Sequence, residues 1–191
     1  PKNDGKLNYS GRGDESYGFL REDFIRAKSS VSACCMFAEL AAWAADRGMS
    51  IYQLLQQVFV EYGLYKDQGV SVVRKGKSGA EEIEAMMKNF RENPLKTLAG
   101  SPVVEVLDYA KLQGLWLDKG EVFTLDMPTT SNVLQYKTAD GTKVSIRPSG
   151  TEPKIKFYIG VRGKVTSKED LPAAEAACLE KIQVIRQELG I

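Results

Sequence analysis

The chain has 191 residues, of which 26 are basic, 25 are acidic and none is histidine, so its formal net charge is +1. This length suits one well-packed core or two small ones. A charge so close to zero argues against broad binding to nucleic acid or to anionic lipid. The absence of histidine excludes histidine catalysis and histidine metal ligands.

The three cysteines do not indicate a disulfide framework, because Cys34 and Cys35 are adjacent and the chain is large. We expect them to be small buried apolar side chains in a reducing compartment. The most apolar stretch, residues 31–45, is shorter than the roughly 18 residues that a membrane span needs. These features predict a soluble, cytoplasmic protein that does not enter a membrane.

The first part of the chain reads as a loop followed by helices. Glycine, serine and charged residues dominate residues 1–20, which we expect to be a loop. Residues 30–46 are almost continuously apolar and predict a buried helix. A Ser50–Gln53 capping box predicts a second, amphipathic helix that ends at Gly63.

A short strand at residues 69–74 and a third helix complete this part. Ser78 and Glu81 form a capping-box pattern, and apolar residues recur at helical spacing until Asn93 and Pro94 stop them. The composition then turns to Pro, Gly, Ser and Thr, so we place a domain boundary between residues 95 and 96.

Residues 96–191 carry mostly strand patterns and one helix. The predicted strands are residues 103–107, 121–125, 133–138, 143–147 and 155–161, with an Asp140-Gly141 hairpin turn. A final helix begins near Ser167 or Asp170 and runs to Leu189. This order predicts an α+β unit, a small antiparallel sheet with a helix on one face.

Basic side chains converge where two of these strands meet a loop. Side chains alternate along a strand, so Arg147 on the incoming strand and Lys154 and Lys156 on the outgoing strand lie opposite the apolar set. Between them, Ser149, Gly150 and Thr151 offer hydroxyl and backbone donors. A phosphate monoester needs this combination of guanidinium, ammonium and short donors. The alternative is a plain turn with a solvated basic face.

The run Arg147-Pro148-Ser149-Gly150-Thr151-Glu152-Pro153-Lys154 resembles the phosphate-binding loop of the α-D-phosphohexomutase family, the phosphoglucomutases and phosphomannomutases. The resemblance implies that Arg147, Ser149, Gly150 and Thr151 hold the substrate phosphate that is not being transferred. It also implies that Lys156 is a further basic contact.

A second run, Gly13-Asp14-Glu15-Ser16-Tyr17-Gly18, resembles the sugar-binding loop of the family's third domain. By this resemblance Asp14, Glu15 and Ser16 recognise sugar hydroxyls, although the family usually has glutamate where Asp14 stands. Lys28 lies in a stretch that resembles a substrate-contacting segment of the family. Without the resemblance, this glycine-rich acidic stretch reads as a flexible connector.

The resemblance covers nearly the whole chain. Residues 1–95 correspond to the mostly helical C-terminal portion of the α/β third domain, and residues 96–191 to the complete fourth domain. The family's phosphoserine context and its Asp-x-Asp-x-Asp magnesium loop are absent from the sequence. We therefore expect no catalytic residue and no metal ligand in this chain, which starts at Pro1 as a piece of a longer protein would.

The resemblance implies an isomerase that interconverts hexose 1-phosphate and hexose 6-phosphate. It would use a phosphoserine, Mg²⁺ and a hexose 1,6-bisphosphate intermediate, with upstream domains 1–3 covalently attached. This part would bind the phosphorylated hexose and be inactive alone. The alternative is a non-catalytic phosphate- or nucleotide-binding module, which a steep salt dependence of RNA or DNA binding would favour.

Overall fold

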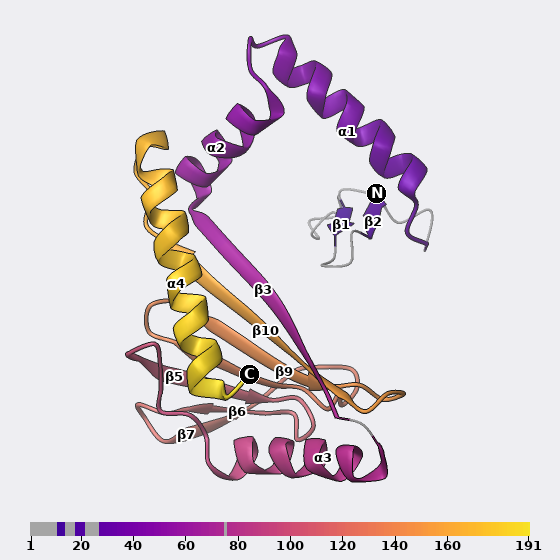
Figure 1. Ribbon diagram of the computed structural model, residues 1–191, viewed down its shortest axis with the longest axis vertical. Helices are drawn as coiled ribbons and strands as arrows, with labels where there is room; N and C mark the ends of the chain where they lie inside the picture. The colour runs from indigo at the N-terminus through magenta and orange to yellow at the C-terminus, as the bar shows by residue number, and fades with distance from the viewer. Residues whose placement is uncertain (1–10, 14–17, 22–26, 75) are drawn as a thin grey trace. The chain divides into compact units, whose positions relative to one another are not determined.

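The computed structural model describes residues 11–13, 18–21, 27–74 and 76–191. The chain divides into two compact units, Pro1–Val58 and Phe59–Ile191, and the division falls within a helix (Figure 1). The domain boundary predicted between residues 95 and 96 stays a prediction. The compact units divide earlier because residues 64–92 pack with the sheet of the second unit, as described below.

The described part of the first unit begins with two short paired strands where the sequence predicted a loop. Strand β1 (Gly11–Gly13) pairs antiparallel with β2 (Phe19–Arg21). Helix α1 (Ser30–Ala45) follows, and the Ser29 hydroxyl caps it by accepting a hydrogen bond from the Ser32 N–H at 3.3 Å. The prediction of a helix at residues 30–46 is confirmed.

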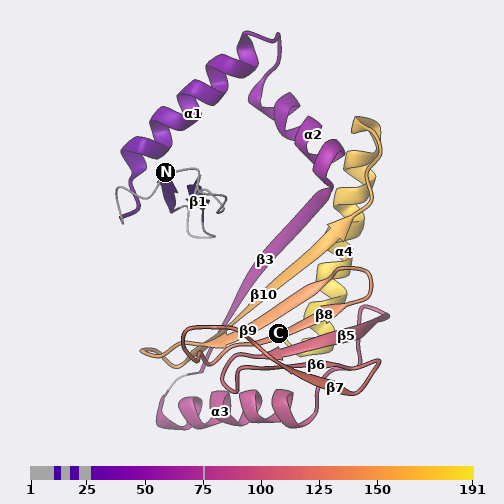
Figure 2. The same cartoon turned by 180° about the vertical axis from the view of Figure 1, so that it is seen from behind.

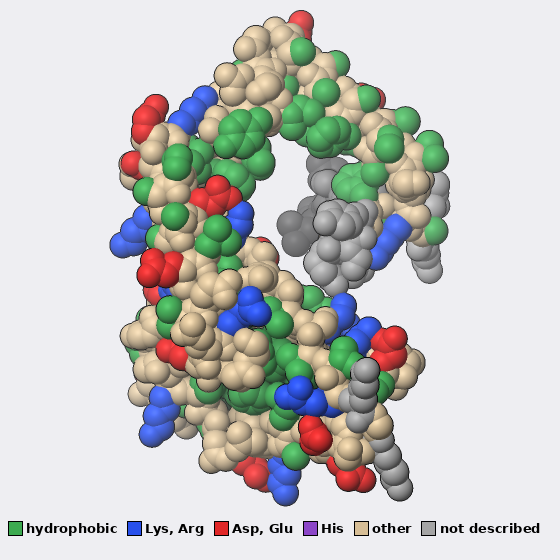
Figure 3. Space-filling view, viewed as in Figure 1, with side chains coloured by type: hydrophobic (Ala, Val, Ile, Leu, Met, Phe, Trp, Pro, Cys, Tyr) green, Lys and Arg blue, Asp and Glu red, His purple; other side chains and the backbone are tan. Residues whose placement is uncertain are grey.

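The expectation that this helix is buried was wrong for the described residues. Ala44 is the buried residue of α1, whereas Phe37 is 59% exposed and Cys34 and Cys35 are both exposed. Hydrophobic side chains lie on the surface over α1 and over α2 (Ile51–Tyr62), as Figure 3 shows. Apolar composition predicts that a helix needs an apolar partner, and it does not say whether that partner is within the chain.

Helix α2 has the predicted capping box. The Ser50 N–H donates to Gln53 Oε1 at 2.8 Å, and the Gln53 N–H donates to the Ser50 hydroxyl at 3.2 Å. Two backbone donors that the first helical turn leaves unpaired are thereby satisfied.

The second unit is built on one antiparallel sheet with the order β3-β10-β9-β8-β5-β6-β7, and β4 pairs with β5. Its strands are β3 (Leu64–Val73), β4 (Thr97–Leu98), β5 (Ser101–Asp108), β6 (Gln113–Trp116), β7 (Glu121–Thr124), β8 (Leu134–Thr138), β9 (Lys143–Pro148) and β10 (Lys154–Gly163). The antiparallel sheet predicted from the sequence is confirmed, and β3 extends it.

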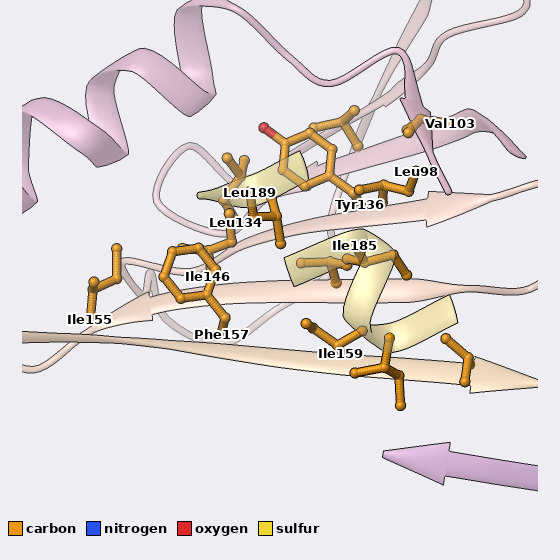
Figure 4. Packing of buried hydrophobic residues seen from close by; sticks show 14 of the residues in the cluster. Leu98, Val103, Leu134, Tyr136, Ile146, Ile155, Phe157, Ile159, Ile185 and Leu189 are labelled. Carbon is orange, nitrogen blue, oxygen red and sulfur yellow. The ribbon is translucent and has the colours of Figure 1, made fainter. Parts of the chain in front are cut away.

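Two helices pack on the same face of this sheet. Helix α3 (Gly76–Glu92) begins before the Ser78 expected to cap it, and α4 (Leu171–Leu189) follows a short 3₁₀ turn, η1 (Lys168–Asp170). Their buried side chains share one core with strands β8, β9 and β10, in which Phe157, Ile159 and Ile185 lie close together (Figure 4). From behind, no described helix covers β9 and β10 (Figure 2). We call this uncovered side the open face.

The β8–β9 hairpin is fixed to α4 by its turn. Asp140 accepts hydrogen bonds from the Thr138 hydroxyl at 2.6 Å and the Thr142 N–H at 3.1 Å, and it forms an ion pair with Lys181 of α4. Partial burial acts to raise the pKa of Asp140, but the bonds from Lys181, Thr138 and Thr142 outweigh it and lower that pKa well below its ordinary value. The second strand of this hairpin, β9, enters the predicted phosphate loop.

Candidate functional site

The predicted loop joins two directly paired strands of the sheet. β9 ends at Pro148 and β10 begins at Lys154, with Ile155 opposite Pro148 and Lys156 opposite Arg147. The Ser149 N–H donates to the Lys154 carbonyl at 2.8 Å, and the Lys154 N–H donates to the Glu152 carbonyl at 2.7 Å. These backbone bonds close the loop into a narrow turn at the end of the sheet.

Strand alternation places the basic side chains on the open face. Ile146 and Phe157 are completely buried under the helices, so their strand neighbours Arg147 and Lys156 point the other way. Lys154 shares this side, because it lies two residues from Lys156 on the same strand. The convergence of these three cations, expected from the sequence, is present.

The three cations differ in what they contact. Arg147 is exposed, and among the described side chains it has no ion-pair partner. Lys154 forms an ion pair with Glu152 of the same loop. The Lys156 ammonium lies 5.9 Å from the centre of the Tyr158 ring, within the range of a cation–π contact. Among the described residues, no ion pair would have to break before the Arg147 guanidinium meets a phosphate.

On its other side the loop lines a cleft of about 840 Å³ against α3. Ile83 and Met87, both buried, lie along its helical side, and Ser149, Gly150 and Thr151 line the loop side. At the far end, Arg91 donates from Nε to Asp108 at 3.1 Å and from a terminal nitrogen to Asn132 at 2.6 Å. Such a volume is typical of small-ligand pockets.

The predicted phosphate ligands are thus distributed around one loop rather than in one cavity. Ser149, Gly150 and Thr151 line the cleft, whereas Arg147 and Lys156 extend from the open face. All five belong to the turn or to the second β9–β10 residue pair beside it, Arg147 with Lys156.

The predicted sugar-binding residues belong to the first unit. Asp14, Glu15 and Ser16 lie outside the described residues. Lys28 is described; it is exposed and precedes α1. Their roles stay predictions.

The sequence did not identify two neighbours of the loop, one on β3 and one just beyond its end. Ser71 is exposed and lies directly opposite Lys156, on the same open face. Just beyond β3, the Arg74 N–H donates to the Pro153 carbonyl at 2.9 Å and thereby fixes the end of the loop. The sequence predicted a short strand at residues 69–74. It did not indicate that β3 pairs with β10.

No three His, Cys, Asp or Glu side chains of the described residues gather to hold a metal ion. That part of the chain offers no ligand set for the Mg²⁺ that the resemblance implies.

None of the helices in the described residues combines the length and apolar composition needed to cross a bilayer.

Residues 70–178 match the family model of the phosphoglucomutase/phosphomannomutase C-terminal domain. The chain belongs to this family. It is 31% identical over 148 residues to a phosphoglucomutase of Staphylococcus haemolyticus, and 34% identical over 149 residues to one of Staphylococcus aureus. Each match covers 78% of the chain but 27% of the relative, so the matched region spans about a quarter of these relatives.

A solved structure supports the fold of the family. The open form of parafusin, a phosphoglucomutase from Paramecium, matches 93% of this chain and 30% of its own, with a TM-score of 0.50 and 17% identity. At this identity the likeness bears on the fold alone. The family assignment rests on the sequence matches.

Proposed function

We propose that this chain is the substrate-binding C-terminal part of a phosphohexomutase, and that its β9–β10 loop holds the phosphate that is not transferred. The observation that carries the proposal is the convergence of Arg147, Lys154 and Lys156 beside a glycine turn with two hydroxyls. Guanidinium and ammonium groups bind phosphate through charge-assisted hydrogen bonds, and short hydroxyls take the remaining oxygens. Membership of the family supports the same assignment.

In the complete enzyme, the reaction would interconvert hexose 1-phosphate and hexose 6-phosphate in the cytoplasm. A phosphoserine and Mg²⁺ supplied by upstream domains would transfer the phosphoryl group through a hexose 1,6-bisphosphate. The loop would anchor the distal phosphate, while Asp14, Glu15, Ser16 and Lys28 would read the sugar. Catalysis of phosphoryl transfer depends mainly on positioning and charge stabilisation, and this part would supply positioning.

Titration calorimetry with inorganic phosphate and glucose 6-phosphate tests the role of the loop. Arg147→Ala removes a charged donor that can form bidentate hydrogen bonds. It should weaken the binding of both ligands by about 10- to 100-fold. Arg162→Ala is the matched control: Arg162 is another exposed arginine on the open face, near the far end of β10, and its guanidinium lies 5.5 Å from the Tyr65 ring. Equal affinity of Arg147→Ala and the unmodified chain would refute the phosphate assignment.

Mutase turnover is a separate test. We expect none from the chain alone and expect it from a longer protein that includes the upstream domains. Turnover by the purified 191-residue chain would contradict the assignment of the phosphoserine and Mg²⁺ to other domains.

A further inference from the structure

A carboxylate already lies among the cations of the phosphate loop. Glu152 forms an ion pair with Lys154, and the two side chains are 58% and 29% exposed, respectively. The pair is therefore reachable by a ligand from solvent. Lys154 is one of the three cations that converge on the open face.

The charge of Glu152 is coupled to more than one lysine. A hydrogen bond from Lys154 and the charge of Lys154 lower the pKa of Glu152, the slight burial of the carboxyl opposes them, and the charge of Lys156 lowers that pKa further. Glu152 is consequently ionised wherever a phosphate monoester is a dianion. A carboxylate and a phosphate accept the same charge-assisted hydrogen bonds.

The loop also satisfies part of its own donor set. The Thr151 N–H donates to the Ser149 hydroxyl at 3.4 Å, which is long for a hydrogen bond, and the Lys154 N–H donates to the Glu152 carbonyl. The loop thus contains its own anion, the Glu152 carboxylate, and its own hydrogen-bond acceptors. A bound phosphate would supply the same two functions, a negative charge and acceptor oxygens.

We propose that Glu152 is an internal competitor of the phosphate ligand, which occupies Lys154 in the free loop and lowers the affinity of the site for anions. This inference rests on the proposed phosphate-binding function of the loop. A bound phosphate would take Lys154 from Glu152, and the carboxylate would turn toward solvent. The opposite role would be a positioning carboxylate that holds the loop in its binding shape.

The two roles predict opposite signs for Glu152→Gln. A unit charge about 7 Å from a dianion in water weakens binding about sevenfold without screening, and about twofold at 0.15 M salt. If Glu152 competes, Glu152→Gln therefore binds inorganic phosphate about sevenfold more tightly at low salt, and the gain falls to about twofold at 0.15 M. If Glu152 positions the loop, the same substitution weakens binding, and salt does not remove the loss.

Titration calorimetry with inorganic phosphate at two salt concentrations measures this. Glu121→Gln is the matched control, because Glu121 is an exposed acid on β7, at the opposite edge of the sheet from β3. It loses the same charge and should leave the affinity unchanged. Glu152→Asp keeps the charge and should bind within about twofold of the unmodified chain.

At low salt, unchanged or weaker binding by Glu152→Gln overturns the inference, and so does an Asp variant that binds as tightly as the Gln variant. Arg147→Ala separates this failure from failure of the proposed function. If Arg147→Ala abolishes binding while Glu152→Gln does not strengthen it, the phosphate site stands and the competitor role does not. If the unmodified chain does not bind phosphate, both fail.

Discussion

The hydroxyl of Tyr136 fixes the end of α3 to the sheet, and its removal should destabilise the second unit. Tyr136 is completely buried, and its hydroxyl donates to the Phe90 carbonyl at 2.6 Å. Burial raises the pKa of Tyr136, although a backbone hydrogen bond from Leu95 opposes the shift, so the phenol stays protonated and able to donate. Tyr136→Phe keeps the ring volume and leaves backbone groups without their partner. The expected loss is about 1–3 kcal/mol of unfolding free energy.

Urea unfolding followed by tryptophan fluorescence measures this loss. The chain has two tryptophans, and Trp43 lies in the first unit, so a Trp43→Phe background leaves Trp116 on β6 as the reporter of the sheet. Tyr65→Phe is the control, because Tyr65 is 55% exposed on the edge strand β3. A loss below about 0.5 kcal/mol, or one equal to that of the control, would refute the reasoning.

Three further substitutions test the same unit by urea unfolding. Ile182→Ala removes most of a completely buried side chain of α4 and should lower the free energy of unfolding by about 2–5 kcal/mol. A loss below about 1 kcal/mol would mean that the surrounding side chains fill the cavity. Gly114→Ala should cost about 1–3 kcal/mol, because an added Cβ would lie 2.2 Å from the Phe123 ring; a neutral result would show that the ring moves freely. Asp140→Asn should cost about 0.5–1 kcal/mol at pH 7, a modest value because the side chain is 42% exposed. Because folding lowers the pKa of Asp140, the difference in unfolding free energy between the unmodified chain and Asp140→Asn should be fully present above about pH 4. It should disappear as the pH falls through the pKa of Asp140 in the folded state. A difference that does not change with pH would contradict this reasoning.

Local signals located most elements of the chain. The capping residues at Ser50 and Gln53, the Asp140-Gly141 turn and the alternation along β9 and β10 each depend on neighbours within a few residues. Such patterns can be read without knowledge of the fold. The faces occupied by Arg147 and Lys156 followed from them directly.

The remaining features depend on contacts between distant segments. β3 was predicted too short, because its first half does not carry a clear strand pattern and its register is set by β10. The placement of Ser71 beside Lys156 follows from that pairing. The exposure of α1 was missed for a related reason. An apolar sequence indicates that a helix favours burial, but it does not indicate whether another part of the same chain covers the helix.

β10 has a paired strand on each side, and this has a consequence for how the β9–β10 loop can move. β10 is bonded to β3 along its whole length and to β9 along Ile155–Gly160, so its amides should be among the slowest in the chain to exchange with deuterium. The β9–β10 loop is therefore attached to a strand that is hydrogen-bonded on both sides. We expect any rearrangement on ligand binding to be confined to the few residues between Pro148 and Lys154, where deuterium exchange would detect it first.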